Sequence, residues 1–313
     1  MDDTQLYIEL SPNTLEIAVR ETEDCVAALQ LWFAQNGLDL NPDKSEAILL
    51  STAGRAKSLS SLNTISAAGA KVCLADKVRL LGVTLDASLS LNIHVKYVCR
   101  AAFYHPRALW HIRPSLTEEM ANSVACSLVQ SRRDYANALY VGMSSANSDV
   151  LQRAQNTIAR VMTLSLKRDH ITTSLKRLHW LPVHQRVTYK IATLVYNIRR
   201  SREPDYLYSL LEDYTPTRQL RSTNTQRLCV PRTKLKTGKR AFGIAAPSVW
   251  NALQSEVTST ESLTTFRKLL KTRCGSLDRT CPHCPETYNG DGKILRRMGL
   301  QDLSQQDGHH PLH

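Results

Sequence analysis

Two adjacent acidic residues stand at the start of the sequence. Asp2 and Asp3 precede an alternating segment, Thr4–Leu10, whose apolar residues share one face, as in a half-buried strand. Carboxylates are the natural ligands of Mg²⁺. Two such ions about 4 Å apart activate a hydroxyl nucleophile and stabilise a leaving phosphate. The pair is therefore a candidate metal site for phosphoryl transfer, and a solvated acidic terminus is the alternative reading.

The densest run of positive charge lies further along the chain, in a loop-like segment that ends at Arg240. Its basic members are Arg232, Lys234, Lys236, Lys239 and Arg240. Phe242 follows as a candidate stacking ring, and such a segment suits contact with phosphates. A solvated surface stretch is the alternative. Four basic residues in or near predicted helices could extend the same surface: Arg132, Arg133, Lys167 and Arg168.

Charge is unevenly distributed along the 313 residues. The whole chain carries 40 Lys and Arg against 28 Asp and Glu, a formal charge of +12. Residues 1–50 hold two basic and ten acidic side chains, whereas residues 215–273 hold 12 basic and two acidic ones. An acidic first segment before a long basic body suits a protein that binds metal ions at one end and phosphates along the rest. A basic protein with no nucleic-acid partner is the alternative.

One pair of cysteines has a spacing typical of metal sites. Cys281 and Cys284 flank a Pro-His pair, and Cys274 lies upstream. The order of these residues does not match the usual zinc knuckle, and residues 276–313 are polar and rich in glycine. We therefore predict a disordered tail, and a zinc site that includes Cys281 and Cys284 is the alternative. The other cysteines are expected to be reduced, mostly buried thiols, since no secretory signal precedes them.

The first third of the chain is predicted to mix strands with a helix. The expected elements are a strand over 4–10, a helix over 14–36 ended by Gly37, a strand over 47–50, an exposed connection over 51–70 and a strand over 78–86. Gly82 within the last strand indicates a bulge or a close backbone approach.

Helical periodicity dominates from residue 92 onward. Helices are expected over 92–110, after a capping box at Ser115–Glu118, over 148–164 and over 183–200. Trp180 and Trp250 stand among apolar residues and are predicted to pack in the core. The fold class is therefore α+β, with a few short strands and a helix followed by a mostly helical body.

Several ordered blocks carry a resemblance to a known family. They are Asp2-Asp3 with its strand, the segment Gly37–Glu46, the segment Leu81–Asp86, and the downstream blocks Leu178–Val183, Ala245–Asn251 and Phe266–Lys271. In this order they resemble the reverse transcriptase of non-LTR (LINE-type, jockey/CR1-like) retrotransposons. The resemblance covers about residues 1–275.

The resemblance assigns a role to each block. It implies that Asp2 and Asp3 match the metal-binding pair of the polymerase palm, with Mg²⁺ as the cofactor. Lys44 matches a palm lysine that protonates or neutralises the leaving pyrophosphate. Leu81, Gly82 and Val83 match the hairpin that grips the primer. The helices after residue 92 match the thumb, which tracks a template–primer duplex.

The resemblance also implies boundaries and a limit on activity. It divides the chain into a partial palm over 1–90, a thumb-like region over 91–200, a basic C-terminal region over 201–275 and the tail over 276–313. The third metal-binding carboxylate of the family lies upstream of the motif that Asp2 begins. The expectation is a polymerase fragment that binds Mg²⁺ unproductively and is inactive alone. The alternative is a non-enzymatic protein that binds RNA or DNA through its thumb-like surface.

The sequence also limits the cellular setting. It contains no run of about 18 apolar residues, as a membrane-spanning helix requires, and no secretory signal. The expectation is an intracellular protein of the nucleus or cytoplasm that is neither secreted nor bound to a membrane, with RNA or DNA as its partner. The sequence does not indicate an oligomeric state.

Overall fold

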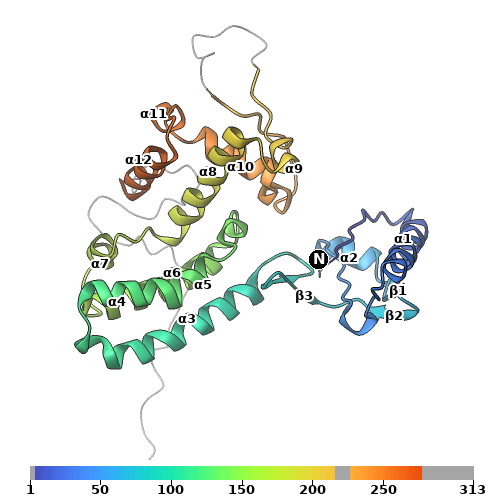
Figure 1. Ribbon diagram of the computed structural model, residues 1–313, viewed down its shortest axis with the longest axis horizontal. Helices are drawn as coiled ribbons and strands as arrows, with labels where there is room; N and C mark the ends of the chain where they lie inside the picture. Colours follow the sequence, from blue (N-terminus) through green and yellow to red (C-terminus); the bar gives the residue numbers. More distant parts are fainter. Residues whose placement is uncertain (1–3, 216–225, 277–313) are drawn as a thin grey trace, which may run out of the picture. The chain divides into compact units, whose positions relative to one another are not determined.

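The computed structural model describes residues 4–215 and 226–276 of the chain (Figure 1). Within these ranges the fold is mixed α+β, with two antiparallel sheets of two strands each in the first third and helices beyond them. The predicted α+β class is confirmed at this level, and its division into palm and thumb stays a prediction. Four predicted site residues lie outside the described ranges: Asp2, Asp3, Cys281 and Cys284.

The first helix, α1 (Leu15–Gln35), confirms the helix predicted over 14–36. Gly37 follows it with φ +73° and donates its N–H to the carbonyl of Ala34 at 3.1 Å. A glycine in this left-handed conformation is the common way to end a helix. Only Ala18 is buried along α1, so most of its apolar side chains, Trp32 among them, stay accessible.

Two strands predicted near the N-terminus are not formed as expected. Residues 4–10 pair with no described strand, and Tyr7 among them is 98% exposed. Alternation alone does not make a strand, because the backbone N–H and C=O groups need a neighbour to pair with. Of residues 47–50, only Ala47 makes a bridge, which is parallel and reaches Leu74.

The stretch over 51–70, predicted as an exposed connection, contains regular structure instead. It holds α2 (Ala53–Ser58) and β1 (Thr64–Ala67), and β2 (Ala70–Cys73) follows. Strands β1 and β2 form a hairpin whose turn residues, Ala68 and Gly69, have φ +50° and +76°. Both values suit the tight turn of a two-residue hairpin. Alanine is rarely found there, which is why the sequence did not indicate the turn.

The segment predicted as one strand over 78–86 is a second hairpin. Strand β3 (Lys77–Leu80) pairs with β4 (Val83–Asp86), and the residues next to the turn, Leu80 and Val83, face each other. Gly82 therefore lies in the turn and not at a bulge.

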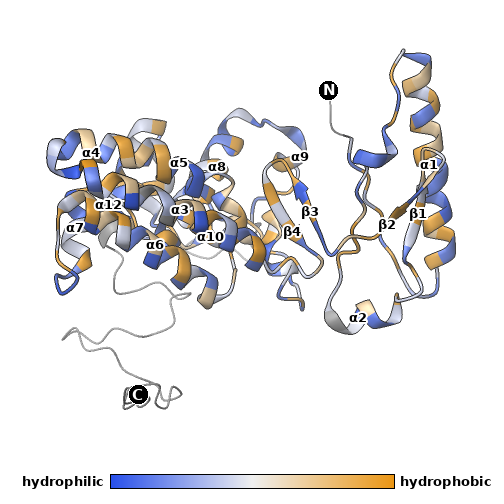
Figure 2. Cartoon of the chain, turned by 90° about the horizontal axis from the view of Figure 1, so that it is seen from below, coloured by the Kyte–Doolittle hydropathy of each residue, from blue (hydrophilic) through white to orange (hydrophobic). Residues whose placement is uncertain are grey.

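Helices form the remainder of the described chain. Their bounds are α3 (Asn92–Ile112), α4 (Glu118–Ala125), α5 (Ser131–Asp134), α6 (Ser145–Thr163), α7 (Ile171–Arg177), α8 (Val183–Ser201), α9 (Asp205–Tyr208), α10 (Phe242–Asn251), α11 (Ser255–Thr258) and α12 (Leu263–Ser276). A π-turn, η3 (Cys126–Gln130), joins α4 to α5. Hydrophilic and hydrophobic bands alternate along α3, α4, α6 and α8 (Figure 2), as expected of helices that bury one face.

The predicted core tryptophans are buried, which confirms their packing role. The indole N–H of Trp180 donates to Oδ1 of Asn122 at 3.0 Å, and that of Trp250 donates to the carbonyl of Gln226 at 2.8 Å. Phe266 is buried between Tyr196 and Trp250, with ring centroids 4.3 and 6.1 Å away. Aromatic side chains thus tie the C-terminal helices to α8.

Candidate nucleic-acid interface

The tip of the β3–β4 hairpin is docked on the helical body. The phenolic O–H of Tyr135 donates to the carbonyl of Leu81 at 2.6 Å. The turn residues have φ +44° at Leu81 and +80° at Gly82. A Cβ at Gly82 would lie 3.3 Å from the Tyr135 ring, so glycine serves both the turn and the close contact. Leu81 itself stays exposed beside the Tyr135 ring.

The base of the hairpin is held by the carboxylate of Asp86. It accepts five hydrogen bonds, from the N–H and O–H of Ser88, the N–H and O–H of Ser90 and the N–H of Leu91, at 2.6–3.2 Å. Burial raises the pKa of this carboxyl, but the hydrogen bonds outweigh burial and leave the pKa below its ordinary value. The charged form therefore fixes the link between β4 and α3.

That link contains two strained residues. Leu89 and Leu91 have φ +53° and +61°, a left-handed conformation that costs a branched side chain about 1–2 kcal/mol. Such strain persists only where the surroundings overdetermine the backbone. Asp86 supplies this restraint, since its carboxylate bonds the N–H of Leu91 directly.

A buried histidine connects β4 to the helical body at a second point. Nδ1 of His94 accepts the backbone N–H of Thr84 at 3.3 Å, and its Nε2 lies 3.3 Å from the phenolic oxygen of Tyr140. These partners assign the proton of the neutral ring to Nε2. Burial lowers the pKa of His94 and raises that of Tyr140 to about 12, so both groups are neutral near pH 7.

Acidification is expected to weaken this contact. Because the pKa of His94 in the folded protein is below its ordinary value of 6.5, the stability contributed by the neutral ring is complete above pH 6.5. It is lost as the pH falls through the folded-state pKa. We expect the difference in free energy of unfolding between the wild type and His94→Gln to be smaller at pH 5 than at pH 7.5 in urea titrations. Exposed His111→Gln is the control, and a difference that is unchanged or larger at pH 5 contradicts the prediction.

Arg240 attaches the end of the basic loop (Arg232–Arg240) to the same region. Its guanidinium donates to the carbonyl of Leu89 and, at 3.4 Å, to that of Leu139. Gly142 lies against its stem with φ +63°, where a Cβ would come within 2.9 Å of Arg240 Cγ. Burial lowers the pKa of Arg240, and the negative charge of Asp86 partly offsets this. Arg240 was predicted to contact phosphate, but in the structure it anchors the loop.

The other charges of the basic loop face solvent. Arg232, Lys234, Lys236 and Lys239 are all exposed, as is Arg132 close to Tyr135. Arg79 on β3 is exposed too, one residue before the end of its strand. Arg79 was not among the predicted site residues, because its position near a hairpin turn depends on the pairing of β3 with β4. We call these six exposed cations the hairpin-side cations, because they belong to the basic loop, precede Tyr135 in the chain or lie on β3.

Two residues that were predicted to contact nucleic acid, one basic and one aromatic, point toward the protein interior. Arg133 is 3% exposed and donates to Oε1 of Gln130 at 3.2 Å, and burial lowers its pKa to about 10. It is therefore charged but too enclosed for contact with a surface phosphate, contrary to the prediction. Phe242 packs against the core and is not the exposed stacking ring that we expected.

Lys167 and Arg168 lie at the opposite end of α6 from the hairpin. At the start of α6, the side chain of Asn147 donates to the carbonyl of Ser90 at 3.2 Å and to Oδ1 of Asn92 at 2.9 Å. The 19 residues of α6 span about 28 Å. The structure therefore separates Lys167 and Arg168 from the hairpin-side cations, although both residues are exposed.

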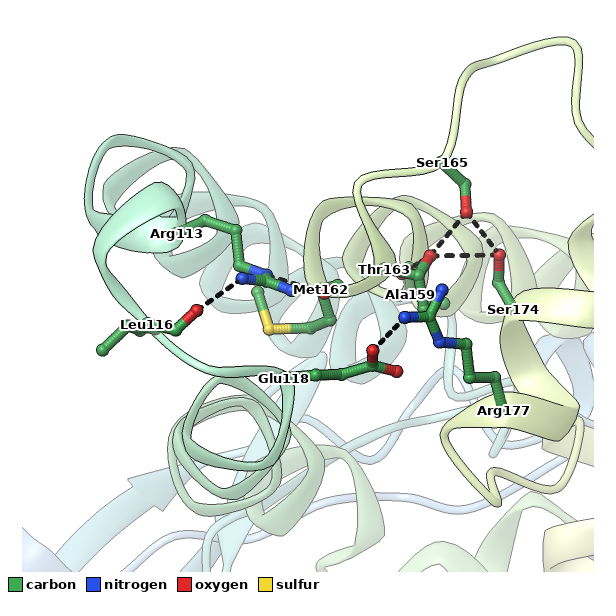
Figure 3. Close-up of polar contacts among 9 residues, drawn as sticks. All are labelled: Arg113, Leu116, Glu118, Ala159, Met162, Thr163, Ser165, Ser174 and Arg177. Carbon is green, nitrogen blue, oxygen red and sulfur yellow. Dashed lines mark hydrogen bonds and ion pairs between the residues drawn. The ribbon is translucent and has the colours of Figure 1, made fainter.

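The far end of α6 is held by polar contacts (Figure 3). Arg113 is buried and donates to the carbonyls of Met162 at 2.7 Å and Leu116 at 2.8 Å, which satisfies a carbonyl at the end of α6. Hydroxyls of Thr163, Ser165 and Ser174 lie 2.7–3.1 Å apart beside it. They line a pocket of about 200 Å³, and its other lining residues include His170 and Arg177.

Comparison of the chain with family models, with curated proteins and with solved structures finds no match. The resemblance to a reverse transcriptase therefore remains a prediction.

Of the catalytic candidates Asp2, Asp3 and Lys44, only Lys44 lies within the described residues. Lys44 is exposed at the end of a 3₁₀ turn, η1 (Pro42–Lys44), in which Oδ1 of Asn41 accepts the N–H of Asp43 at 3.0 Å. In the described part of the chain, no three His, Cys, Asp or Glu side chains form a group suited to a metal ion. Cys274 is buried in α12. None of the helices within the described ranges is long and apolar enough to cross a membrane.

What the geometry offers is a cationic surface with a rigid support. Four exposed positive side chains belong to the basic loop, which Arg240 attaches to Leu89 beside the hairpin, and Tyr135, Asp86 and His94 fix that hairpin to the helical body. Cations at this density attract a polyanion without reading its sequence, because phosphate contacts position a nucleic acid and base contacts specify it.

Proposed function

We propose that this chain is the template–primer-binding part of a non-LTR retrotransposon RNA-directed DNA polymerase. In this proposal the β3–β4 hairpin takes the primer-grip role, and the helices from α3 to α8 take the role of the thumb. The observation that carries it is the attachment of Arg240 to Leu89, next to the base of the hairpin. This contact joins the basic loop, over 140 residues later in the chain, to the connection that directly follows the hairpin matched to the primer grip.

Contact with a duplex is expected to show a steep dependence on salt. If the six hairpin-side cations each neutralise a phosphate, the affinity should fall roughly 10³-fold between 50 and 200 mM salt. The measurement is fluorescence anisotropy of a labelled 16-base-pair RNA–DNA duplex titrated with the full chain. Absence of binding at 50 mM salt, or an affinity insensitive to salt, contradicts the proposal.

Binding alone does not separate a polymerase part from a nucleic-acid-binding protein that has no polymerase role. The discriminating variant is Gly82→Val at the hairpin tip, where a Cβ would press on the Tyr135 ring and the positive φ disfavours a branched residue. A primer grip predicts that this variant loses preference for a duplex with a recessed primer end over a blunt one. A binding protein that uses only the basic loop predicts no such preference in the wild type.

A further inference from the structure

The outward face of α3 has an unusual composition. Six of its exposed residues are basic or aromatic: Lys96, Tyr97, Arg100, Tyr104, Arg107 and His111. Their spacing of three, four and seven residues places them on one stripe of an α-helix. We call this set the α3 stripe. The opposite face of α3 carries Val95, Cys99, Ala102 and Leu109 and is buried in the core. In Figure 1, α3 runs along the lower edge of the helical body.

The positive charge of the stripe is not balanced by acidic side chains within the described residues. The 21-residue helix contains no Asp or Glu, and Lys96, Arg100 and Arg107 form no ion pair with any residue that the structure describes. Along the axis they are separated by about 6 and 10 Å, since each residue advances an α-helix by about 1.5 Å. Three uncompensated cations in one row favour an anionic chain as the partner.

The aromatic residues of α3 are accessible to an unusual degree. Tyr97 and Tyr104 are 48% and 74% exposed, and Trp110, beside the stripe, is 56% exposed. The two tyrosines lie about 10 Å apart along the helix axis, which is far enough to contact different nucleotides. Rings of this size are usually withdrawn from water, and when exposed beside cations they offer faces on which bases stack.

We propose that the α3 stripe binds single-stranded nucleic acid, with bases on Tyr97 and Tyr104 and phosphates on Lys96, Arg100 and Arg107. A duplex does not explain the rings, because its bases are already stacked inside the helix and present only edges and backbone. Unpaired bases expose their faces and stack on aromatic side chains without sequence preference. This inference goes beyond the proposed function, since it concerns a different surface and a different form of nucleic acid.

The test is anisotropy with labelled 20-nucleotide oligo(U) and oligo(dT), whose bases form no stable pairs. The wild type is expected to bind both at 50 mM salt. Tyr97→Ala and Tyr104→Ala are each expected to weaken the affinity about tenfold, whereas Phe at either position keeps the ring and the affinity. The variant Lys96→Gln/Arg100→Gln/Arg107→Gln should lower the salt slope by about 2, since single strands contribute about 0.7 per phosphate.

Matched controls make the result specific to α3. Tyr206 and Tyr214 are exposed to a similar degree elsewhere, and Tyr206→Ala/Tyr214→Ala should bind the oligonucleotides as the wild type does. A wild type that binds the duplex but neither oligonucleotide overturns this inference and leaves the proposed function standing. The inference is also overturned if the alanine variants bind normally. Binding only to vesicles of 70% phosphatidylcholine and 30% phosphatidylserine would overturn it as well.

Discussion

Replacing Asp86 with alanine is expected to lower the free energy of unfolding by about 3 kcal/mol. The carboxylate is buried and accepts five hydrogen bonds, and removing a buried acceptor costs about 1–3 kcal/mol for each donor left unsatisfied. The N–H of buried Leu91 has no water to replace its lost partner. The strained backbone at Leu89 and Leu91 would also lose its restraint. Urea denaturation followed by circular dichroism measures the change.

Asp76→Ala is the matched control for this prediction. Asp76 is exposed on the connection between β2 and β3, and no hydrogen bond to its carboxylate is formed within the described residues. Its removal should change the free energy of unfolding by less than about 0.5 kcal/mol. Asp86→Asn keeps one acceptor oxygen and should fall between the two. If Asp86→Ala is as stable as Asp76→Ala, the carboxylate does not hold the hairpin.

Helices of this chain were readable from sequence because their signals are local. The predicted helices over 14–36, 92–110, 148–164 and 183–200 all appear, with ends within a few residues. Periodic burial, capping residues and terminal glycines act within one or two turns. The start of α4 was predicted correctly, but the capping box at Ser115–Glu118 was wrong: Thr117 is the N-cap, and its side chain accepts the N–H of Met120.

Strands were harder to predict because pairing is not local. The alternating segment over 4–10 had the right period but has no partner among the described residues, whereas β1 and β2 had no clear period and do pair. Their turn and that of β3–β4 use Ala68 and Leu81 at positive φ, where asparagine or glycine would have indicated a hairpin. The hydrogen bond from the phenolic O–H of Tyr135 to the carbonyl of Leu81 offsets the backbone strain of Leu81 in the second turn.

The inward position of Arg133 has a specific cause. Ala121, Ala125, Val129 and Arg133 are all buried, a period of four that an uninterrupted α-helix would carry off one face. The π-turn η3 widens the helix between α4 and α5 and keeps the four side chains aligned. The sequence predicted that both Arg132 and Arg133 contact phosphate. The π-turn is what buries Arg133 and leaves Arg132 exposed.

The anchoring role of Arg240, like the burial of Arg133, could not be predicted from the sequence. Within the basic loop it is one cation among five, and nothing local separates it from Lys239. Its function depends on carbonyls at Leu89 and Leu139 and on the space that Gly142 leaves for its stem. The sequence therefore indicated a basic loop, and the structure separates Arg240, which anchors this loop, from its four exposed basic residues.

Reversing three charges of the basic loop is expected to weaken binding of the RNA–DNA duplex strongly. In Lys234→Glu/Lys236→Glu/Lys239→Glu, three proposed phosphate contacts become repulsive, while Arg240 still anchors the loop. We expect the dissociation constant for the RNA–DNA duplex to rise at least 100-fold at 50 mM salt and the salt slope to fall by about 3. Because all three side chains are exposed, the free energy of unfolding should change little. Fluorescence anisotropy at several salt concentrations gives both quantities.

The control for this variant must change net charge by the same amount elsewhere. Arg267→Glu/Lys268→Glu/Lys271→Glu does so with three exposed side chains of α12, a helix that the proposal does not use. Long-range attraction to a polyanion depends on net charge and would weaken equally in both variants, whereas direct contact weakens only the loop variant. Equal losses would therefore refute the loop as the binding site. A selective loss of duplex affinity, with oligo(U) binding reduced much less, would also establish the basic loop and the α3 stripe as two separate surfaces.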